Sequence, residues 1–131
     1  PGVALSDIAL DATNVYWAES DLSDVLPPVI MTAPKAGGTA TPVATIATHD
    51  PGELALDATG VYWLDDQTQA LMRAPKSGGA PAVVIGDQVT ATKFGGFGAL
   101  AVDASGLYWI ADTTCGADCT GKIVSLAASC R

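Results

Sequence analysis

Short apolar runs, separated by turn signals, recur along this chain at a fixed spacing. Three segments align in register: IALDATNVYWAES from Ile8, LALDATGVYWLDD from Leu54 and LAVDASGLYWIAD from Leu100. Each copy begins 46 residues after the one before it. An internal period of this length indicates a repeat architecture, in which one structural unit is built several times.

Within a copy, the turn residues divide the apolar runs into four short strands, which we name a to d. In the first copy the pattern predicts strand a at Ile8–Asp11, strand b at Val15–Ala18 and strand c at Ile30–Ala33. Strand d returns as PVATIA in the first copy and as AVVIG in the second. Each copy is therefore expected to be a small antiparallel sheet.

Two kinds of turn join these strands. The a–b turn ends in Asn14, Gly60 or Gly106, where we expect a left-handed backbone conformation. The aspartate that opens this turn is expected to accept backbone N–H groups across it. The c–d turn reads Pro-Lys-Ala-Gly-Gly or Pro-Lys-Ser-Gly-Gly, and its glycines suit a positive φ. The three aspartates are Asp11, Asp57 and Asp103.

Strand b is apolar at consecutive positions, with the sequences Val-Tyr-Trp-Ala, Val-Tyr-Trp-Leu and Leu-Tyr-Trp-Ile. Because successive side chains of a strand point to opposite faces, both faces of the sheet must be covered. Small sheets stacked around an axis meet this need, and 46 residues is the size of a propeller blade. The pattern therefore predicts an all-β chain of three β-propeller blades, with Trp17, Trp63 and Trp109 in equivalent, largely buried positions.

The copies resemble the YWTD-type repeat of six-bladed β-propellers, which occurs in lipoprotein-receptor ectodomains and in many secreted bacterial proteins. The shared pattern is a strand ending in Leu-Asp, a turn, Val-Tyr-Trp-x-Asp and a strand that leads to a Gly-Gly turn. Asp65 falls on the Asp of the family pattern, whereas Glu19 and Ala111 stand at that position in the other copies. The resemblance implies a propeller fold, and it implies the family's inter-blade hydrogen bond only for Asp65.

The expected blades cover about 5–48, 52–93 and 98–131 of one repeat domain. In the third copy, GKIVSLAASCR supplies strand c over Lys122–Ala127, and no Gly-Gly turn or strand d follows. The third blade is therefore expected to lack its outer strand. A β-trefoil, which also has three four-stranded repeats, is the alternative fold.

Three blades are fewer than the four to eight of a closed ring, so both ends of the set would expose apolar faces. Further sequence or association of copies would cover these faces. Two chains would make six blades, and stacking that does not close would make a filament. We expect the N-terminal segment to supply the missing strand to a neighbour. The residues expected in this pairing are Gly2, Val3, Ala4 and Leu5 on one side and Lys122, Ile123, Val124, Ser125 and Leu126 on the other.

The amino-acid composition limits the kinds of partner and the location that we expect for this chain. The chain has 6 Lys plus Arg against 14 Asp plus Glu, a formal charge of −8, so nucleic acid is not an expected partner. No apolar run approaches the ~18 residues of a membrane span. The cysteines, the few lysines and the many Thr and Ala residues favour a secreted or cell-surface protein.

The three cysteines form an odd set. Cys115 and Cys119 lie close together in the loop between strands b and c, where we expect a disulfide between them. Cys130 is then left free, or joined to another chain or segment. A zinc site needs more ligands than these and the remote His49, so no metal site is predicted.

Most acidic residues fall in the b–c and d–a loops, which share one end of a propeller and are called the loop face here. Loops of variable length on a rigid scaffold commonly carry binding, and this face is expected to attract a cationic or basic ligand. Calcium is possible, although no EF-hand or nonapeptide motif is present. The expected ligand-binding residues are Glu19, Asp21, Asp24, His49, Asp50, Asp65, Asp66 and Asp112.

These features favour a non-enzymatic binding or assembly module without catalytic residues or a cofactor. The chain has one His and no Gly-x-Ser-x-Gly motif. One alternative is part of a propeller hydrolase or lyase, with His49 beside Asp50 as a general base on the loop face. The other is a trefoil-type carbohydrate-binding lectin.

Overall fold

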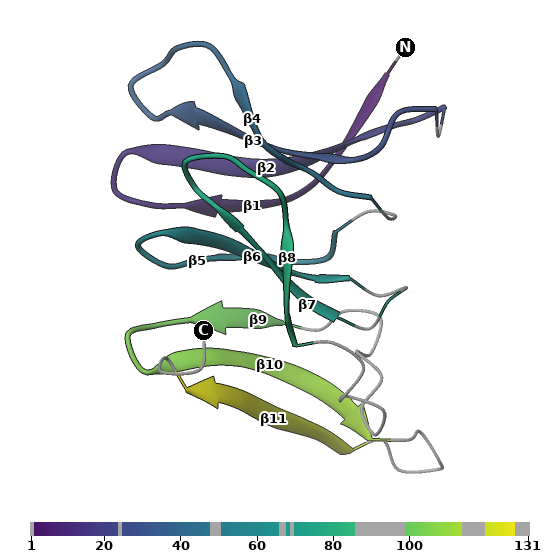
Figure 1. The fold of residues 1–131 in the computed structure, drawn as a ribbon, viewed down its shortest axis with the longest axis vertical. Coiled ribbons are helices and arrows are strands. Elements are labelled where there is room, and N and C mark those ends of the chain that lie inside the picture. Colours follow the sequence, from purple (N-terminus) through teal and green to yellow (C-terminus); the bar gives the residue numbers. More distant parts are fainter. Residues whose placement is uncertain are drawn as a thin grey trace.

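The computed structural model describes residues 2–23, 25–47, 51–65, 68, 70–85, 99–113 and 120–127. In this part of the chain, eleven strands form three separate antiparallel sheets and no helix occurs. The sheets are stacked one beside the next, as Figure 1 shows. This arrangement confirms the all-β prediction, and separate stacked sheets are propeller blades rather than a trefoil.

Each sheet follows chain order, because consecutive strands are antiparallel neighbours. The sheet orders are β1-β2-β3-β4 for blade 1, β5-β6-β7-β8 for blade 2 and β11-β10-β9 for blade 3. Strand β5 lies beside both β1 and β9, so the first strands of the three blades are neighbours. The strand bounds are β1 Val3–Leu10, β2 Asn14–Asp21, β3 Val29–Pro34, β4 Thr41–Thr45, β5 Leu54–Leu56, β6 Gly60–Asp65, β7 Ala70–Pro75, β8 Ala82–Ile85, β9 Leu100–Val102, β10 Gly106–Thr113 and β11 Thr120–Ala127.

Blade 3 has three strands within the described residues, with β11 at its outer edge, as expected. Strand β1, however, starts earlier than predicted. Val3, Ala4 and Leu5 pair with β2 of their own blade, and the carbonyl oxygen of Gly2 accepts the N–H of Leu22 at 3.2 Å. The segment that we expected to supply a strand to a neighbour is therefore paired with β2 of its own blade in the single chain. A register shift between Leu5 and Ile8 explains why the sequence pattern placed the start of this strand at Ile8, because the shift interrupts the alternation that marks a strand.

The turns differ in how well their sequence predicted them. The c–d turns have positive φ at Gly37, Gly38, Gly78 and Gly79, as expected. The left-handed conformation expected at Gly60 and Gly106 is wrong, since neither has a positive φ. Both glycines instead lie close to a neighbouring strand, where the contact is with backbone only at Gly106. A Cβ on Gly106 would overlap the carbonyl oxygen of Leu126, and one on Gly60 would lie 2.6 Å from Nε of Arg73.

Apolar side chains form two cores, one between each pair of adjacent blades. We call the face that a blade turns toward the preceding blade its front face, and the opposite face its back face. Strand β6 supplies both, with Val61 and Trp63 in front and Tyr62 and Leu64 behind. The front-face residues are Leu54, Leu56, Val61, Trp63, Met72 and Ala74 in blade 2 and Leu100, Val102, Leu107, Trp109, Val124 and Leu126 in blade 3.

The three tryptophans occupy equivalent strand positions but differ in burial. Trp63 and Trp109 are 0% and 3% exposed, as expected. Trp17 is only half-buried, because no blade precedes blade 1 in the described structure. The position of a blade in the stack, as well as its sequence, therefore sets the burial of its tryptophan.

Candidate interaction surfaces and the links between blades

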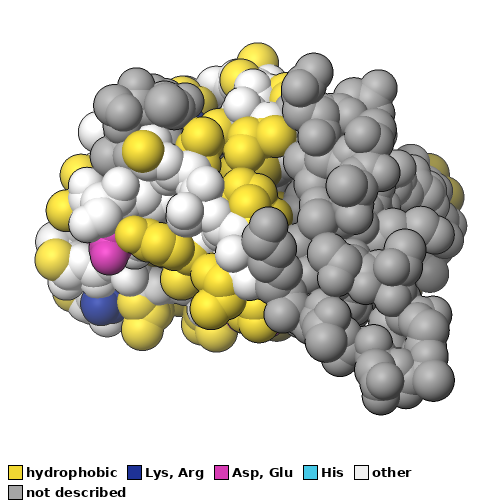
Figure 2. Space-filling model, turned by 90° about the horizontal axis from the view of Figure 1, so that it is seen from below, with side chains coloured by type: hydrophobic (Ala, Val, Ile, Leu, Met, Phe, Trp, Pro, Cys, Tyr) yellow, Lys and Arg dark blue, Asp and Glu magenta, His cyan; other side chains and the backbone are white. Residues whose placement is uncertain are grey.

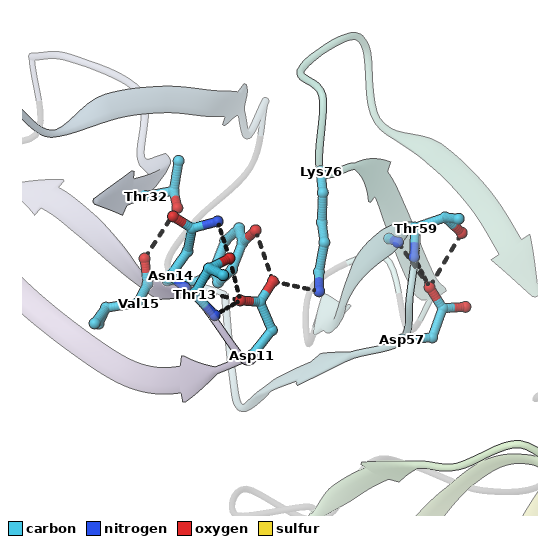
Figure 3. A network of polar contacts seen from close by, with 10 residues as sticks. Asp11, Thr13, Asn14, Val15, Thr32, Asp57, Thr59 and Lys76 are labelled. Carbon is cyan, nitrogen blue, oxygen red and sulfur yellow. Dashed lines mark hydrogen bonds and ion pairs between the residues drawn. The ribbon is translucent and has the colours of Figure 1, made fainter. Parts of the chain in front are cut away.

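A carboxylate in the a–b turn of blade 1 joins blades 1 and 2. Oδ1 of Asp11 accepts the N–H groups of Thr13 at 2.9 Å and Asn14 at 2.8 Å, which confirms its predicted role in the turn. Oδ2 accepts the hydroxyl of Tyr16 at 3.1 Å and binds Nζ of Lys76 at 2.8 Å. Figure 3 shows Lys76 reaching from the c–d turn of blade 2 toward this carboxylate. The lysine ammonium, followed by the turn N–H groups, lowers the pKa of Asp11 far below its ordinary value.

The same turn in blade 2 carries a related network. Oδ1 of Asp57 accepts the N–H groups of Thr59 and Gly60, both at 2.7 Å, and Oδ2 accepts the Tyr62 hydroxyl at 2.7 Å. Nε of Arg73 donates to that hydroxyl at 3.1 Å from the same blade. Burial raises the pKa of Asp57, but the Tyr62 hydroxyl and the turn N–H groups outweigh it and lower the value to about 2.

The same surroundings that lower the pKa of Asp57 raise the pKa of Tyr62. Burial disfavours the phenolate first, and the neighbouring Asp57 carboxylate disfavours it further. Tyr62 therefore stays a neutral donor to Asp57, and the pair acts as a fixed structural element of the turn. Oδ1 of Asp103 likewise accepts the N–H groups of Ser105 at 2.7 Å and Gly106 at 3.0 Å. The predicted role of the turn aspartates is therefore confirmed in all three blades.

A second kind of inter-blade link was missed by the sequence analysis. Oδ2 of Asp7 accepts the N–H of Leu54 at 2.7 Å, and Oε2 of Glu53 accepts the N–H of Leu100 at 3.0 Å. In each case an acid just before strand a binds the backbone at the start of strand a in the next blade. The signal was an acid directly before Ile8 and Leu54; Ala99 stands at that position in the third copy.

The front face of blade 1 is an open apolar surface. Its residues match those that are packed between blades elsewhere, yet Ile8 is 63% exposed whereas Leu54 is 6% exposed. The register places Ile8 opposite Trp17 and Leu54 opposite Trp63, which shows that the positions are equivalent. The blade 1 front face consists of Ile8, Leu10, Val15, Trp17, Met31 and Ala33.

The back face of blade 3 is the matching surface at the other end. Ile110 and Ile123 pair across β10 and β11, as Leu64 and Leu71 pair across β6 and β7. Ile123 is 74% exposed, whereas Leu71 is fully buried. Figure 2 views the molecule from this end and shows hydrophobic side chains over much of the described surface, with few charges among them.

Three of the predicted loop-face acids, Glu19, Asp21 and Asp65, accept hydrogen bonds from donors close to them in the sequence. Oε1 of Glu19 accepts the Trp17 indole N–H at 2.8 Å. Asp21 accepts the hydroxyl of Ser23 at 2.6 Å, which is the main cause of its lowered pKa. Asp65 is buried and accepts the N–H of Thr68 at 3.0 Å. These carboxylates shape the ends of β2 and β6.

Several predicted site residues lie outside the described residues. The structure places Asp112 in β10 opposite Gly121 and Lys122 in β11 opposite Ala111, without describing their side chains. Among the residues that it does describe, no three His, Cys, Asp or Glu side chains are grouped so as to hold a metal ion. The predicted residues that fall outside are Asp24, His49, Asp50, Asp66, Cys115, Cys119 and Cys130.

A pocket of about 400 Å³ opens between blades 1 and 2 near the loop face. Trp63, Met72 and Val83 line its blade 2 side, and Ile46 lines its blade 1 side, with Asp65 as the charged group. Nε1 of Trp63 is buried without a hydrogen-bond partner. The mostly apolar lining suits a small apolar group, and the unpartnered indole N–H of Trp63 could donate to an acceptor on that group.

No helix in the described part of the chain is long and apolar enough to cross a membrane. No family model matches this sequence, and no curated protein matches it. Among solved structures, a chain from the crystal structure of a nidogen/laminin complex is similar, with a TM-score of 0.64 and 20% identity. The match covers 92% of this chain and 48% of that chain. At this identity the likeness is one of fold, and it supports a YWTD-like β-propeller architecture; this chain spans about half the length of that chain.

Proposed function

We propose that this chain is a non-enzymatic, extracellular binding module that associates with copies of itself through the two end faces of its blade stack. The observation that carries the proposal is the open front face of blade 1. Its six positions are the ones that blades 2 and 3 bury against a neighbouring blade. An apolar sheet face of this kind is typical of a surface that another protein covers.

The polar groups support binding rather than catalysis. The described acids of the loop face and of the a–b turns bind N–H or O–H groups of their own chain, which holds them as structural acceptors. A cationic ligand on the loop face, with calcium as the lesser possibility, stays a prediction from the sequence. The secreted or cell-surface location is part of the proposal and rests on the cysteines and the resemblance to extracellular propellers.

Face-to-face packing is favoured over strand addition. Val3, Ala4 and Leu5 would have to leave β2 before they could pair with β11 of a second copy. The nidogen/laminin complex, whose name describes an assembly of two proteins, is consistent with a propeller that works by binding proteins. This chain matches about half of that chain, and two copies of three blades would supply six.

Light scattering across a wide range of protein concentrations tests this function. We expect a mass that rises in multiples of the 13.2 kDa chain, stopping at two copies for a closed ring and continuing for a filament. A 13.2 kDa species at every concentration, with a melting temperature independent of concentration, would contradict the proposal.

A further inference from the structure

We propose that the front face of blade 1 in one copy packs on the back face of blade 3 in a second copy, in the register that blades use within the chain, with Lys35 of the first copy bound to Asp103 of the second. This inference rests on the proposed function and deepens it. It identifies the partner as another copy of this chain and assigns the contact residues.

The backbone around Lys35 has the same geometry as the backbone around Lys76. The N–H of Lys35 donates to the carbonyl oxygen of Thr13 at 2.8 Å, and that of Lys76 donates to Thr59 at 2.9 Å. The following turns match as well, with φ values of 92° at Gly37 and 89° at Gly78. Lys35 is exposed. Because Lys76 reaches from its own blade to Asp11 of the preceding blade, Lys35 is placed to reach a blade that packs on the front of blade 1.

Asp103 matches Asp11 at the other end of the chain. Each aspartate uses Oδ1 to hold the N–H groups two and three residues ahead. Each is followed at the same spacing by a tyrosine, Tyr16 in blade 1 and Tyr108 in blade 3. Lys76 lies 5.2 Å from the ring centroid of Tyr16 while it binds Asp11. A lysine from a following blade would meet the same pair of groups in blade 3.

The apolar faces fit one another in the same register. In blade 2, Leu64 and Leu71 receive the front face of blade 3, which includes Leu100 and Trp109. Ile110 and Ile123 occupy the corresponding positions on the back of blade 3. The first copy would bring Ile8 and Trp17 of its blade 1 to the two isoleucines of the second copy. Both isoleucines are exposed in one chain, so this contact would remove a continuous apolar surface from water.

The carboxylate-to-backbone hydrogen bond that joins neighbouring blades has no counterpart in the proposed contact between copies. Asp7 and Glu53 bind the first backbone N–H of the next blade, but Ala99 stands at their position in blade 3. Ile8 of the first copy would therefore find no carboxylate for its N–H in blade 3 of the second copy. The contact between copies is accordingly weaker than the contacts between blades, and an acid at position 99 should strengthen it.

The contact joins two different surfaces, so it is heterologous. Two copies that meet at both ends close a ring of six blades. Copies whose rotation does not close make an open filament. The residue contacts are the same in both assemblies.

Sedimentation velocity on the full chain tests the register through a matched pair of lysine variants. We expect Lys35→Ala to weaken association about fivefold or more, with the free energy of unfolding of the single chain unchanged. Lys76→Ala should lower that free energy and leave association in place. In an Asp103→Asn background, which keeps an oxygen for the turn, Lys35→Ala should lose its effect on association. A Lys35→Ala effect of equal size in both backgrounds, or no effect in either, would overturn the proposal.

A gain of association provides an independent readout. Ala99→Glu should tighten association severalfold, whereas Ala58→Glu, the same charge change at an exposed turn of blade 2, should not. Equal dissociation constants for these two variants would overturn the register. Self-association that persists through all of these variants would leave the proposed function intact and refute only this contact. A wild-type chain that never associates would instead refute the proposed function.

Discussion

Lys76 and Asp11 lie 65 residues apart in the sequence, and their charged atoms lie 2.8 Å apart across the boundary between blades 1 and 2. The lysine leaves the c–d turn of one blade, and the aspartate holds the a–b turn of the other. Both side chains are largely shielded from water, which strengthens the ion pair relative to one on an open surface. The pair therefore links the c–d turn of blade 2 to the a–b turn of blade 1, beside the apolar core that the two blades share.

Replacing Lys76 with alanine should lower the free energy of unfolding by about 1 to 2 kcal/mol, because Asp11 loses its charged partner while staying within the turn. Urea denaturation followed by tryptophan fluorescence measures this change. Lys35→Ala is the matched control, since its ammonium has no partner in the chain's described residues, and it should leave the midpoint of the single chain unchanged. Equal effects of the two substitutions would show that the ion pair does not stabilise the stack.

The turn aspartates predict the pH dependence of stability. The pKa of Asp57 is about 2 in the folded chain, below its ordinary value of 3.8. Its contribution to stability is therefore fully present above about pH 4 and is lost as the pH falls toward 2. Asp57→Asn should remove this part of the dependence, about 1 to 2 kcal/mol, while keeping the turn oxygen. Urea unfolding at pH 6 and pH 2.5 tests it, and an unchanged pH slope in the variant would contradict it.

Two glycines that share a position in the repeat should respond differently to alanine. In Gly106→Ala the new Cβ meets the carbonyl oxygen of Leu126, which is backbone and cannot move away without disturbing the β10–β11 pairing. In Gly60→Ala it meets the guanidinium of Arg73, which can swing aside. We expect Gly106→Ala to cost at least 2 kcal/mol more than Gly60→Ala, on the order of an overpacking strain. Thermal melts of both variants give the comparison, and a larger loss in Gly60→Ala would refute the explanation.

The buried tryptophans should matter more for stability than the one at the open face. Trp63→Ala is expected to cost about 3 to 5 kcal/mol, because the side chain is fully enclosed between two blades. Trp17→Ala should cost clearly less in the single chain, since its face is open. Chemical denaturation at a concentration below association separates the two. Equal losses would mean that Trp17 is enclosed by a part of the chain that the repeat pattern does not assign.

The turns and the apolar strand faces could be predicted from the sequence. The Asx turns at Asp11, Asp57 and Asp103 and the Gly-Gly turns follow from the side chains of four or five neighbouring residues. The unbroken apolar run of Val61, Tyr62, Trp63 and Leu64 correctly predicted that both sheet faces are covered. These features recur in the aligned repeats, so each repeat supported the structure predicted for the others.

The contacts between blades could not be predicted from the sequence in the same way. The bond from Asp7 to Leu54 and the ion pair from Lys76 to Asp11 depend on how one sheet is rotated against the next, which no single repeat encodes. The pairing of Val3–Leu5 was hidden by the register shift before Ile8. Gly106 was misinterpreted because turn glycines commonly supply a positive φ, whereas this one makes room for a neighbouring strand.

Trp17 is the most direct reporter of whether a second copy covers the front face of blade 1. Acrylamide quenching of wild type, compared with Trp17→Phe at each concentration, isolates its accessibility from that of Trp63 and Trp109, which are already buried. We predict that the quenching assigned to Trp17 falls as the protein concentration rises and approaches that of the buried tryptophans when association is complete. Quenching of Trp17 that stays constant from nanomolar to high micromolar concentration would contradict the account.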